Sequence, residues 1–455
     1  MDKDNNIIPL TGRIAIIDDN INEAKPLMRE FSKNNIPYVY IKGDDPSFFP
    51  DQPDNDIRIL FLDINLLGQS PTDYKNIKSN LINVIRKVIS PNNYPYVLIY
   101  WSLQEREYDS IIREAFDTVL TDRRPISIHR FIKPDFFSLP GGEEQPTDKD
   151  IIKELKIIIQ SIPAYSYLMQ WENIAHCSTD ELLKEVFPNT EPKEWENVTN
   201  AIINSLGQSF IGQHFSDASN EEKIKASLLA LNMVFIDSMD NRIGKCNISN
   251  PQELSSNNLD KQKIEELKTT LNHKLLVYTS PTNICEPGVV IQYSNTAKDY
   301  FEQFLHKVLS VFSIKHEILC KTPDILDSLL KKEVSNRIKQ IKQEIQQTWL
   351  KIGVVVTPSC DFAQKKKICD RVVQGVMIEA RFIDYINQGD AFYTSPIIKH
   401  NGNNYIIVLN FNYFITTDLT NGSSCNMLFK IRRPMLAEIQ SKLARHINRQ
   451  GIMNL

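Results

Sequence analysis

The chain has 455 residues, of which 42% are hydrophobic and 24% charged, and its formal net charge is −4. This length predicts two to four domains, and this composition is typical of soluble globular proteins. The chain has no apolar run near the roughly 18 residues of a membrane-spanning helix, and its N-terminus has no signal-peptide core. Its seven cysteines include no CxxC pair, which argues against a zinc ribbon or a disulfide framework and favours a cytoplasmic location.

Short apolar runs alternate with amphipathic stretches over the first 160 residues. Strands are predicted at 13–19, 38–43, 57–63, 95–102 and 127–134, and helices at 20–35, 72–89, 104–116 and 147–162. Thr147 is the predicted N-cap of the last of these helices. Strands that alternate with helices, and that are apolar throughout, predict a doubly wound α/β domain with a parallel sheet.

The carboxyl ends of the predicted strands carry polar side chains. The first strand ends in Asp18 and Asp19, the third in Asp63, the fourth in Ser102 and the fifth in Lys133. Ligands of an open parallel sheet bind at this edge, so we expect these side chains to converge on one crevice. A carboxylate buried in an apolar run, such as that of Asp63, needs a cationic partner, and Lys133 can supply it.

This set of side chains is suited to phosphoryl transfer. Asp18, Asp19 and Asp63 offer the hard oxygen ligands that Mg²⁺ prefers, and the backbone carbonyl of Asn65 is placed to complete the set. The carboxylate of Asp63 can also act as a nucleophile and form an acyl phosphate. The lysine and the serine at the neighbouring strand ends can bind phosphoryl oxygens.

The motifs IIDDN, FLDINLLG, YWS and FIKP, in this order, make residues 10–160 resemble the receiver domain of two-component response regulators. The resemblance covers about a third of the chain and implies a flavodoxin-like fold. It also implies that Asp63 accepts a phosphoryl group from a partner histidine kinase. By the same resemblance, Mg²⁺ lies on Asp18, Asp19 and the backbone carbonyl of Asn65.

The resemblance further implies that Ser102 and Lys133 bind the phosphate and that a cis peptide bond precedes Pro134. One position departs from the family, because Arg130 stands three residues before the lysine, where receivers usually carry an aromatic residue. Readout of phosphorylation through a serine–aromatic pair is therefore not carried over. Taken singly, the adjacent aspartates would be interpreted as helix caps and the lysine as a surface residue, so the prediction rests on their joint placement.

Residues 161–322 are predicted to form a helical middle region. A capping box of Ser178 and Glu181 predicts a helix start, and 220–239 has the pattern of an amphipathic helix. A long helix is predicted over 323–350, with Thr322 as its N-cap. Its narrow apolar stripe either packs on its own domain or forms a homodimer seam. The stripe consists of Leu326, Leu330, Val334, Ile338, Ile341, Ile345 and Trp349.

Residues 351–455 are predicted to form a small β-rich domain, barrel-like or open, that ends in a basic helix at 434–451. Strands are predicted at 352–360, 371–383, 403–418 and 426–433, with a turn at 401–404. From 331 to 455 the chain has 18 Lys and Arg against 9 Asp and Glu, a net charge of +9. Such a basic end is compatible with nucleic-acid contact, with a solvated surface and with a contact between domains.

Cys360 and Asp361 follow an apolar strand and precede three lysines. A cysteine nucleophile there needs a base, for which His400 and His446 are the nearest candidates in sequence; alternatively, Cys360 is a small buried hydrophobic residue and Asp361 caps a turn. The segment is loosely similar to "SCD"-type β-domains of uncharacterised bacterial proteins, some from kinase-linked conflict or phage-defence loci. That similarity implies no activity.

Together these features predict a response-regulator-like signalling protein whose only chemistry is the phosphoacceptor reaction of its N-terminal domain. The output of the C-terminal domain is not predicted, and no membrane contact is expected. Two alternatives remain open. One is an effector enzyme that acts on nucleic acid through the basic C-terminal domain and is gated by the receiver, and the other is a pseudo-receiver scaffold that binds partners without phosphate.

Overall fold

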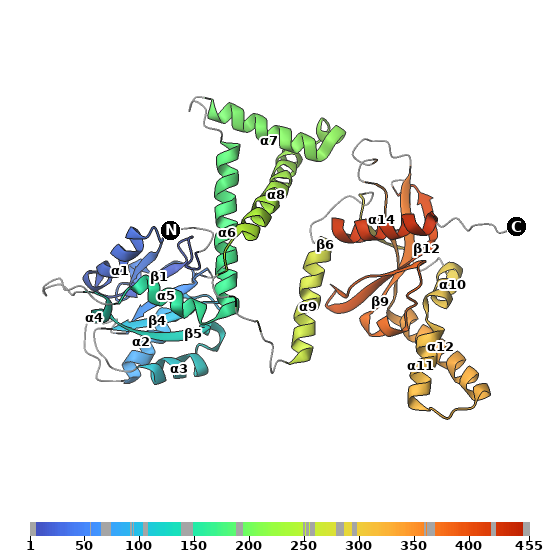
Figure 1. Cartoon of the computed structure of the whole chain (residues 1–455), viewed down its shortest axis with the longest axis horizontal. Coiled ribbons are helices and arrows are strands. Elements are labelled where there is room, and N and C mark those ends of the chain that lie inside the picture. The colour runs from blue at the N-terminus through green and yellow to red at the C-terminus, as the bar shows by residue number, and fades with distance from the viewer. Residues whose placement is uncertain are drawn as a thin grey trace. The chain divides into compact units, whose positions relative to one another are not determined.

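The computed structural model describes residues 6–54, 56–64, 74–91, 93, 95–102, 108–137, 149–187, 194–248, 251, 254, 260–278, 286–293, 298–358, 361, 369–419 and 425–448. The chain divides into two compact units (Figure 1). The N-terminal unit comprises Met1–Phe210 and Ile224–Ser255, and the C-terminal unit comprises Ile211–Lys223 and Ser256–Leu455.

The N-terminal unit is built on a five-stranded sheet in which all strands are parallel. The strands are β1 (Ile14–Asp18), β2 (Val39–Lys42), β3 (Ile59–Asp63), β4 (Val97–Ser102) and β5 (Ser127–Ile132). Their order across the sheet is β2-β1-β3-β4-β5. This is the order of flavodoxin-like doubly wound sheets, in which ligands bind beyond the carboxyl ends of the strands. The predicted α/β class and its five parallel strands are confirmed.

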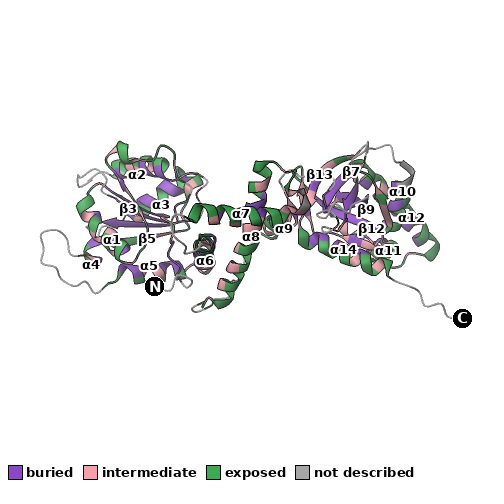
Figure 2. Ribbon diagram, turned by 90° about the horizontal axis from the view of Figure 1, so that it is seen from above, coloured by how far each residue is buried: buried purple, intermediate pink, exposed green. Residues whose placement is uncertain are grey.

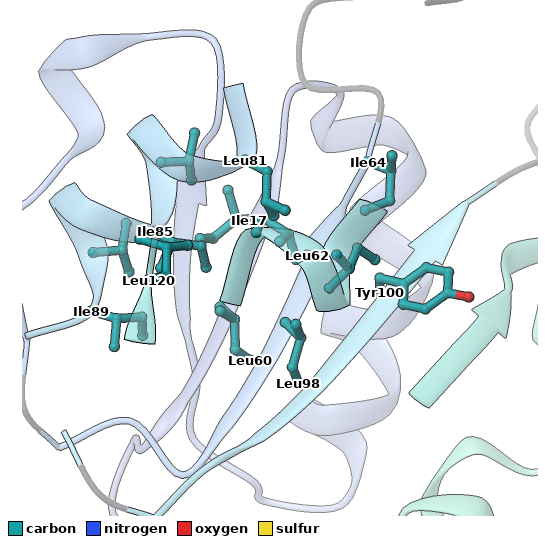
Figure 3. Close-up of a cluster of buried hydrophobic side chains, with 14 of the residues drawn as sticks. Ile17, Leu60, Leu62, Ile64, Leu81, Ile85, Ile89, Leu98, Tyr100 and Leu120 are labelled. Atoms are coloured by element: carbon teal, nitrogen blue, oxygen red, sulfur yellow. The ribbon is translucent and has the colours of Figure 1, made fainter. Parts of the chain in front are cut away.

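Helices cover both faces of this sheet, which is why its central strands are apolar at nearly every position. All residues of β1, β3 and β4 are buried. The helices are α1 (Ile21–Lys33), α2 (Tyr74–Val88), α3 (Asp109–Thr118), the short α4 (Lys133–Phe136) and α5 (Ile151–Gln160). Successive side chains of a strand alternate between the faces of the sheet. Leu60 and Leu62 pack with α2 and α3 (Figure 3), whereas Phe61 packs with α1 and α5 on the other face.

Two local predictions in this unit are wrong. The N-cap of α5 is Asp150, whose carboxylate accepts the backbone N–H groups of Ile152 and Lys153, and Thr147 lies outside the described residues. The peptide bond before Pro134 is trans. Proline occupies the first turn of α4, a position at which its fixed φ and missing N–H fit a helix without a cis bond.

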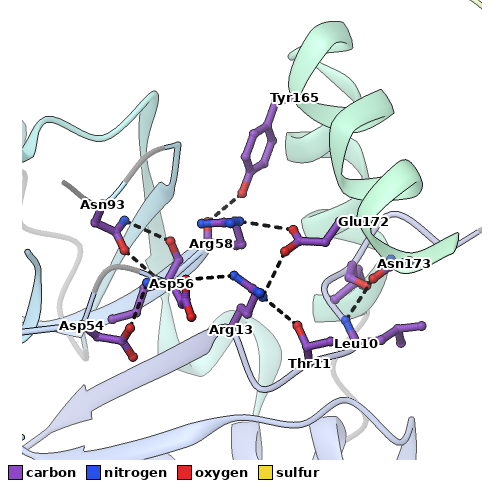
Figure 4. Close-up of polar contacts among 12 residues, drawn as sticks. Leu10, Thr11, Arg13, Asp54, Asp56, Arg58, Asn93, Tyr165, Glu172 and Asn173 are labelled. Atoms are coloured by element: carbon purple, nitrogen blue, oxygen red, sulfur yellow. Dashed lines mark hydrogen bonds and ion pairs between the residues drawn. The ribbon is translucent and has the colours of Figure 1, made fainter. Parts of the chain in front are cut away.

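Helix α6 (Pro163–Val186) is fixed to the amino edge of the sheet by polar contacts (Figure 4). Glu172 accepts from Arg13 Nε at 3.0 Å and from Arg58 Nε at 3.2 Å, and these arginines directly precede β1 and β3. The Tyr165 hydroxyl donates to the carbonyl of Arg58 at 2.7 Å. Asn173 Nδ2 donates to two backbone carbonyls of the N-terminal segment at 2.7 and 2.9 Å. We call these contacts the α6 anchor.

The predicted capping box of Ser178 and Glu181 is wrong, because both residues lie inside α6. The helix already begins at Pro163, so its backbone bonds run through Ser178 without interruption. Glu181 instead accepts from Ser238 and pairs with Arg242 at 2.9 Å, and these contacts join α6 to α8. Helices α7 (Trp195–Ile211) and α8 (Asn220–Lys245) complete this part of the unit, and α8 includes the predicted helix at 220–239.

The C-terminal unit contains an antiparallel sheet with the strand order β10-β12-β9-β8-β7-β13-β6, and β11 pairs with β12. Its strands are β6 (Val277–Tyr278), β7 (Val289–Tyr293), β8 (Leu350–Val355), β9 (Asp370–Glu379), β10 (Phe392–Thr394), β11 (Ile398–His400), β12 (Asn403–Thr417) and β13 (Cys425–Ile431). The predicted turn joins β11 to β12, where Asn401 and Gly402 adopt φ values of 47° and 82°. The first two strands lie well before residue 351, so the sheet is larger than predicted.

Helices pack on both faces of this antiparallel sheet. The helices are α9 (Lys261–Leu276), α10 (Lys298–Val308), α11 (Val311–Lys321), α12 (Asp327–Thr348) and α14 (Arg433–Ile447). Helix α14 matches the predicted basic helix and packs on one face through Leu436, Ile439 and Leu443. Among the helices in the described ranges, none combines the length and apolar character that crossing a membrane requires.

Helix α12 corresponds to the long helix predicted at 323–350. Thr322 is not its N-cap, because this residue ends α11 and the N-cap position is Leu326. The stripe residues Leu330, Val334 and Ile341 are buried in the core of the C-terminal unit with side chains of β9 and β12. The apolar stripe therefore packs on its own domain, which was one of its two predicted roles.

Candidate functional site

Three of the predicted site residues meet at the carboxyl edge of the parallel sheet. Asp18 ends β1, Asp63 ends β3, and Lys133 follows β5 as the first residue of α4. The Lys133 ammonium lies 2.9 Å from Asp18 Oδ2 and 2.9 Å from Asp63 Oδ2. The parallel arrangement brings these strand ends to one edge, and the long lysine side chain reaches from the end of β5 to β3 and β1. The predicted convergence of these residues is confirmed.

Glu23 is the residue that the sequence analysis missed. Its Oε2 accepts from Lys133 Nζ at 2.8 Å, so the lysine binds three carboxylates with the three N–H groups that an ammonium has. Glu23 lies in the first turn of α1, and its Oε1 accepts from the side-chain amide of Asn20, the N-cap, at 2.9 Å. A glutamate three residues after an N-cap was therefore the available signal, but this pattern normally indicates only helix capping.

The remaining predicted residues lie outside the group formed by Lys133 and the three carboxylates that accept from it. Asp19 is half-buried next to Asp18 and is not one of the three carboxylates that surround the lysine. Ser102 is buried at the carboxyl end of β4. Asn65 lies outside the described residues. Arg130, which stands where receivers usually have an aromatic residue, is exposed on β5.

The cluster of Lys133 with Asp18, Glu23 and Asp63, which we call the charge cluster, is almost closed to solvent. Lys133 is 1% exposed, Asp18 is fully buried and Asp63 is 3% exposed. The ammonium also lies 4.7 Å from the ring centroid of the buried Trp101. Charges buried to this extent are tolerated only when they are paired and hydrogen-bonded, which is the arrangement found here.

The charge cluster has three carboxylates but one ammonium, and burial together with these charges shifts the pKa of Asp18 and of Lys133. Burial, together with the nearby charge of Asp63, raises the pKa of Asp18 to about 7, although Lys133 opposes the shift. Burial acts to lower the pKa of Lys133, but the charges of Asp63 and Asp18 outweigh it and hold this pKa above its usual range. Burial and the neighbouring aspartates likewise raise the pKa of Tyr40, which donates to the Asp18 carbonyl, to about 12.

The donor set of the charge cluster fits a small divalent cation. Oxygen atoms of Asp18, Glu23 and Asp63 lie within 4.8 Å of one another. Carboxylate oxygens are hard ligands, and each carboxylate offers about four lone-pair positions, so one can accept from Lys133 and still contact a cation. A divalent cation would also balance the excess negative charge of the cluster. The residues present are therefore suited to Mg²⁺, with Glu23 in addition to the predicted ligands.

The candidate residues of the C-terminal unit do not form a comparable site in the described part of the chain. Cys360 lies outside the described residues, and Asp361 pairs with Arg371 at 3.6 Å near the surface. The ring of His400 packs against Tyr405 and Phe429. His446 contacts Asn412 Oδ1 at 3.2 Å.

Comparisons of the chain with protein-family models, with curated proteins and with solved structures found no match in any of the three. The charge cluster and the sheet that carries it are therefore the basis for assigning a function.

Proposed function

We propose that the N-terminal unit is a receiver-type phosphoacceptor, in which Asp63 takes a phosphoryl group from a phosphohistidine of a partner kinase. The observation that carries this proposal is the charge cluster, because a buried lysine shared by three carboxylates lies at the ligand-binding edge of a parallel α/β sheet. The receiver-like motifs at the ends of β1, β3, β4 and β5 support the same interpretation.

The reaction follows from the position of Asp63. A carboxylate oxygen of Asp63 attacks phosphorus, an O–P bond forms, and the P–N bond of the phosphohistidine breaks. The imidazole leaves with the bonding electron pair, and the product is an acyl phosphate on Asp63. Lys133, which holds Asp63 Oδ2 at 2.9 Å, orients the attacking carboxylate and places a positive charge beside the incoming phosphoryl oxygens.

The other members of the charge cluster prepare the site for an anionic substrate. Asp18 and Glu23 would hold Mg²⁺, together with the predicted ligands Asp19 and the Asn65 carbonyl. When bound, Mg²⁺ supplies positive charge that offsets the charge of the phosphoryl group. Without it, three carboxylates would repel a phosphoryl donor more strongly than one ammonium attracts it. Ser102 ends β4 at the same edge of the sheet, which supports a contact of its hydroxyl with a phosphoryl oxygen.

Intact-mass spectrometry tests this proposal directly. The full chain is incubated with acetyl phosphate and Mg²⁺, and a parallel sample with beryllofluoride and Mg²⁺ is examined for ligand binding. We expect one phosphoryl adduct that hydroxylamine removes, as an acyl phosphate requires, and no adduct on Asp63→Asn. Asp45→Asn is the matched control, because Asp45 is a partly exposed aspartate whose side chain caps the short 3-10 helix Pro46–Phe48. A folded wild-type protein that neither gains the adduct nor binds beryllofluoride would refute the proposal.

The link from the phosphoacceptor to an output stays a prediction. A partner histidine kinase and a role in bacterial defence rest on the sequence resemblances alone. Nucleic-acid contact through the basic end of the chain rests on its charge of +9 from residue 331 onward.

A further inference from the structure

Helix α8 exposes apolar side chains that a folded chain normally buries. In the stretch 226–236 of this helix there is no charged residue. Nevertheless only Ala226, Ser227 and Met239 of α8 are buried, and Figure 2 shows most of the helix as exposed or intermediate. A helix with this composition ordinarily lies in a core, so its exposure points to a surface that another molecule covers.

One exposed face of α8 has the pattern of a helix-pairing surface. Leu229, Met233 and Ile236 are 48%, 55% and 57% exposed and follow one another at spacings of four and three residues. Lys225 precedes them by four residues and Asp240 follows them by four, and both are exposed. These five residues, which we call the α8 stripe, lie within about 80° of one another around the helix axis. The stripe runs from a cation through three apolar residues to an anion.

We propose that the α8 stripe is a homodimer surface on which α8 of a second copy packs in the antiparallel direction. Pairing two identical surfaces ordinarily places like charges together, but the centre of the stripe has no charge. With a two-fold axis between residues 232 and 233, Leu229 of each copy faces Ile236 of the other. In the same register Lys225 faces Asp240 at both ends of the contact. A parallel pair would instead place Lys225 against Lys225 and Asp240 against Asp240.

The size of the surface fits a reversible dimer. Helix α8 has 26 residues and is therefore about 39 Å long. The apolar residues of the stripe leave a few hundred Å² exposed in each copy, on the order of the largest apolar patch of a typical monomer. Specific, stable interfaces bury roughly 600 to 1,000 Å² per partner, and the apolar part of the stripe is smaller than this, as in weak and transient contacts. We therefore expect dissociation of the dimer in the micromolar range.

Sedimentation velocity of the full chain over concentrations up to roughly 100 μM tests whether the dimer exists. We expect a reversible dimer in the wild type and a monomer in Met233→Arg. Ile224→Arg is the matched control, because Ile224 is 57% exposed but lies on the opposite side of the helix, nine residues or two and a half turns away. Circular dichroism would establish that both variants keep their helix content. A wild type that stays monomeric, or a loss of dimer in both variants, would overturn the proposal.

Charge exchange tests the antiparallel register. Lys225→Glu and Asp240→Lys each place like charges together at both ends of the contact, and we expect each to raise the dimer dissociation constant by about tenfold. The double variant restores opposite charges, so its dissociation constant should return to within about threefold of wild type. The antiparallel register would be overturned if neither single variant changed the dissociation constant, or if the double variant dimerised more weakly than both single variants. A Met233→Cys variant should also form a disulfide-linked dimer, because Met233 lies beside the axis, whereas Ile224→Cys should not.

Discussion

Removal of the Lys133 ammonium is the sharpest perturbation of the charge cluster. Lys133→Met keeps an unbranched side chain beside Trp101 but leaves Asp18, Glu23 and Asp63 without their shared donor. Breaking a buried ion pair by removing one partner costs about 3–5 kcal/mol. The three hydrogen bonds of Lys133, at 2.8–2.9 Å, place the cost at the upper end of this range. Protonation of Asp18, however, relieves part of the repulsion among the three carboxylates. We therefore expect a loss of about 4 kcal/mol at a pH slightly above 7.

Hydrogen exchange measured on peptides that cover β1 and β3 reports the stability of this unit by itself. The loss should be largest in EDTA and smaller with millimolar Mg²⁺, because a cation replaces the missing positive charge. Lys149→Met is the matched control, because Lys149 pairs with Asp135 at the surface, and we expect no measurable change in exchange. A loss below about 1 kcal/mol for Lys133→Met in EDTA would refute the view that the lysine neutralises a buried acidic cluster.

Three further predictions concern separate parts of the molecule. The pKa of Asp18 is about 7 in the folded protein, against an ordinary value of 3.8. Without divalent cations, protonation of Asp18 therefore stabilises the fold by up to about 4 kcal/mol. This stabilisation is fully present below about pH 4 and is lost as the pH rises through 7. Asp18→Asn should abolish this pH dependence in urea titrations. Glu172→Gln removes both arginine pairs of the α6 anchor, and we expect a loss of about 1–2 kcal/mol and faster proteolysis of α6. A Cβ on Gly375 would lie 2.3 Å from the carbonyl oxygen of Val408 on the neighbouring strand. We therefore expect Gly375→Ala to destabilise the C-terminal unit by more than about 2 kcal/mol. Hydrogen exchange of β1 and β3 in the N-terminal unit should remain unchanged.

The parallel sheet and most of its site could be predicted because both depend on simple periodic rules. Apolar runs in β1, β3 and β4 indicate strands that are buried on both faces, and such strands are parallel and covered by helices. Once the strands are placed, the residues at their carboxyl ends must share one edge. Asp18, Asp63 and Lys133 could therefore be brought together without knowledge of any distance.

The features that were missed depend on side-chain direction or on distant parts of the chain. Glu23 belongs to the charge cluster only because its side chain turns back from α1 toward the end of β1, which no spacing rule specifies. Ser178 and Glu181 match a capping box in sequence, but a helix that began fifteen residues earlier passes through them. Strand β7 pairs with β8 and β13, which lie far away in sequence, so its place in the C-terminal sheet had no local signal.

The α6 anchor attaches helix α6 to the two strands that end in the aspartates of the charge cluster. Arg13 and Arg58 hold Glu172 at the amino ends of β1 and β3, and the same strands end in Asp18 and Asp63. Beyond the anchored Asn173 the helix extends by about 20 Å to Val186, so a tilt of about 5° at Asn173 moves its far end by about 2 Å. Through Glu181, which contacts Ser238 and Arg242, the same helix that is held at β1 and β3 also touches α8.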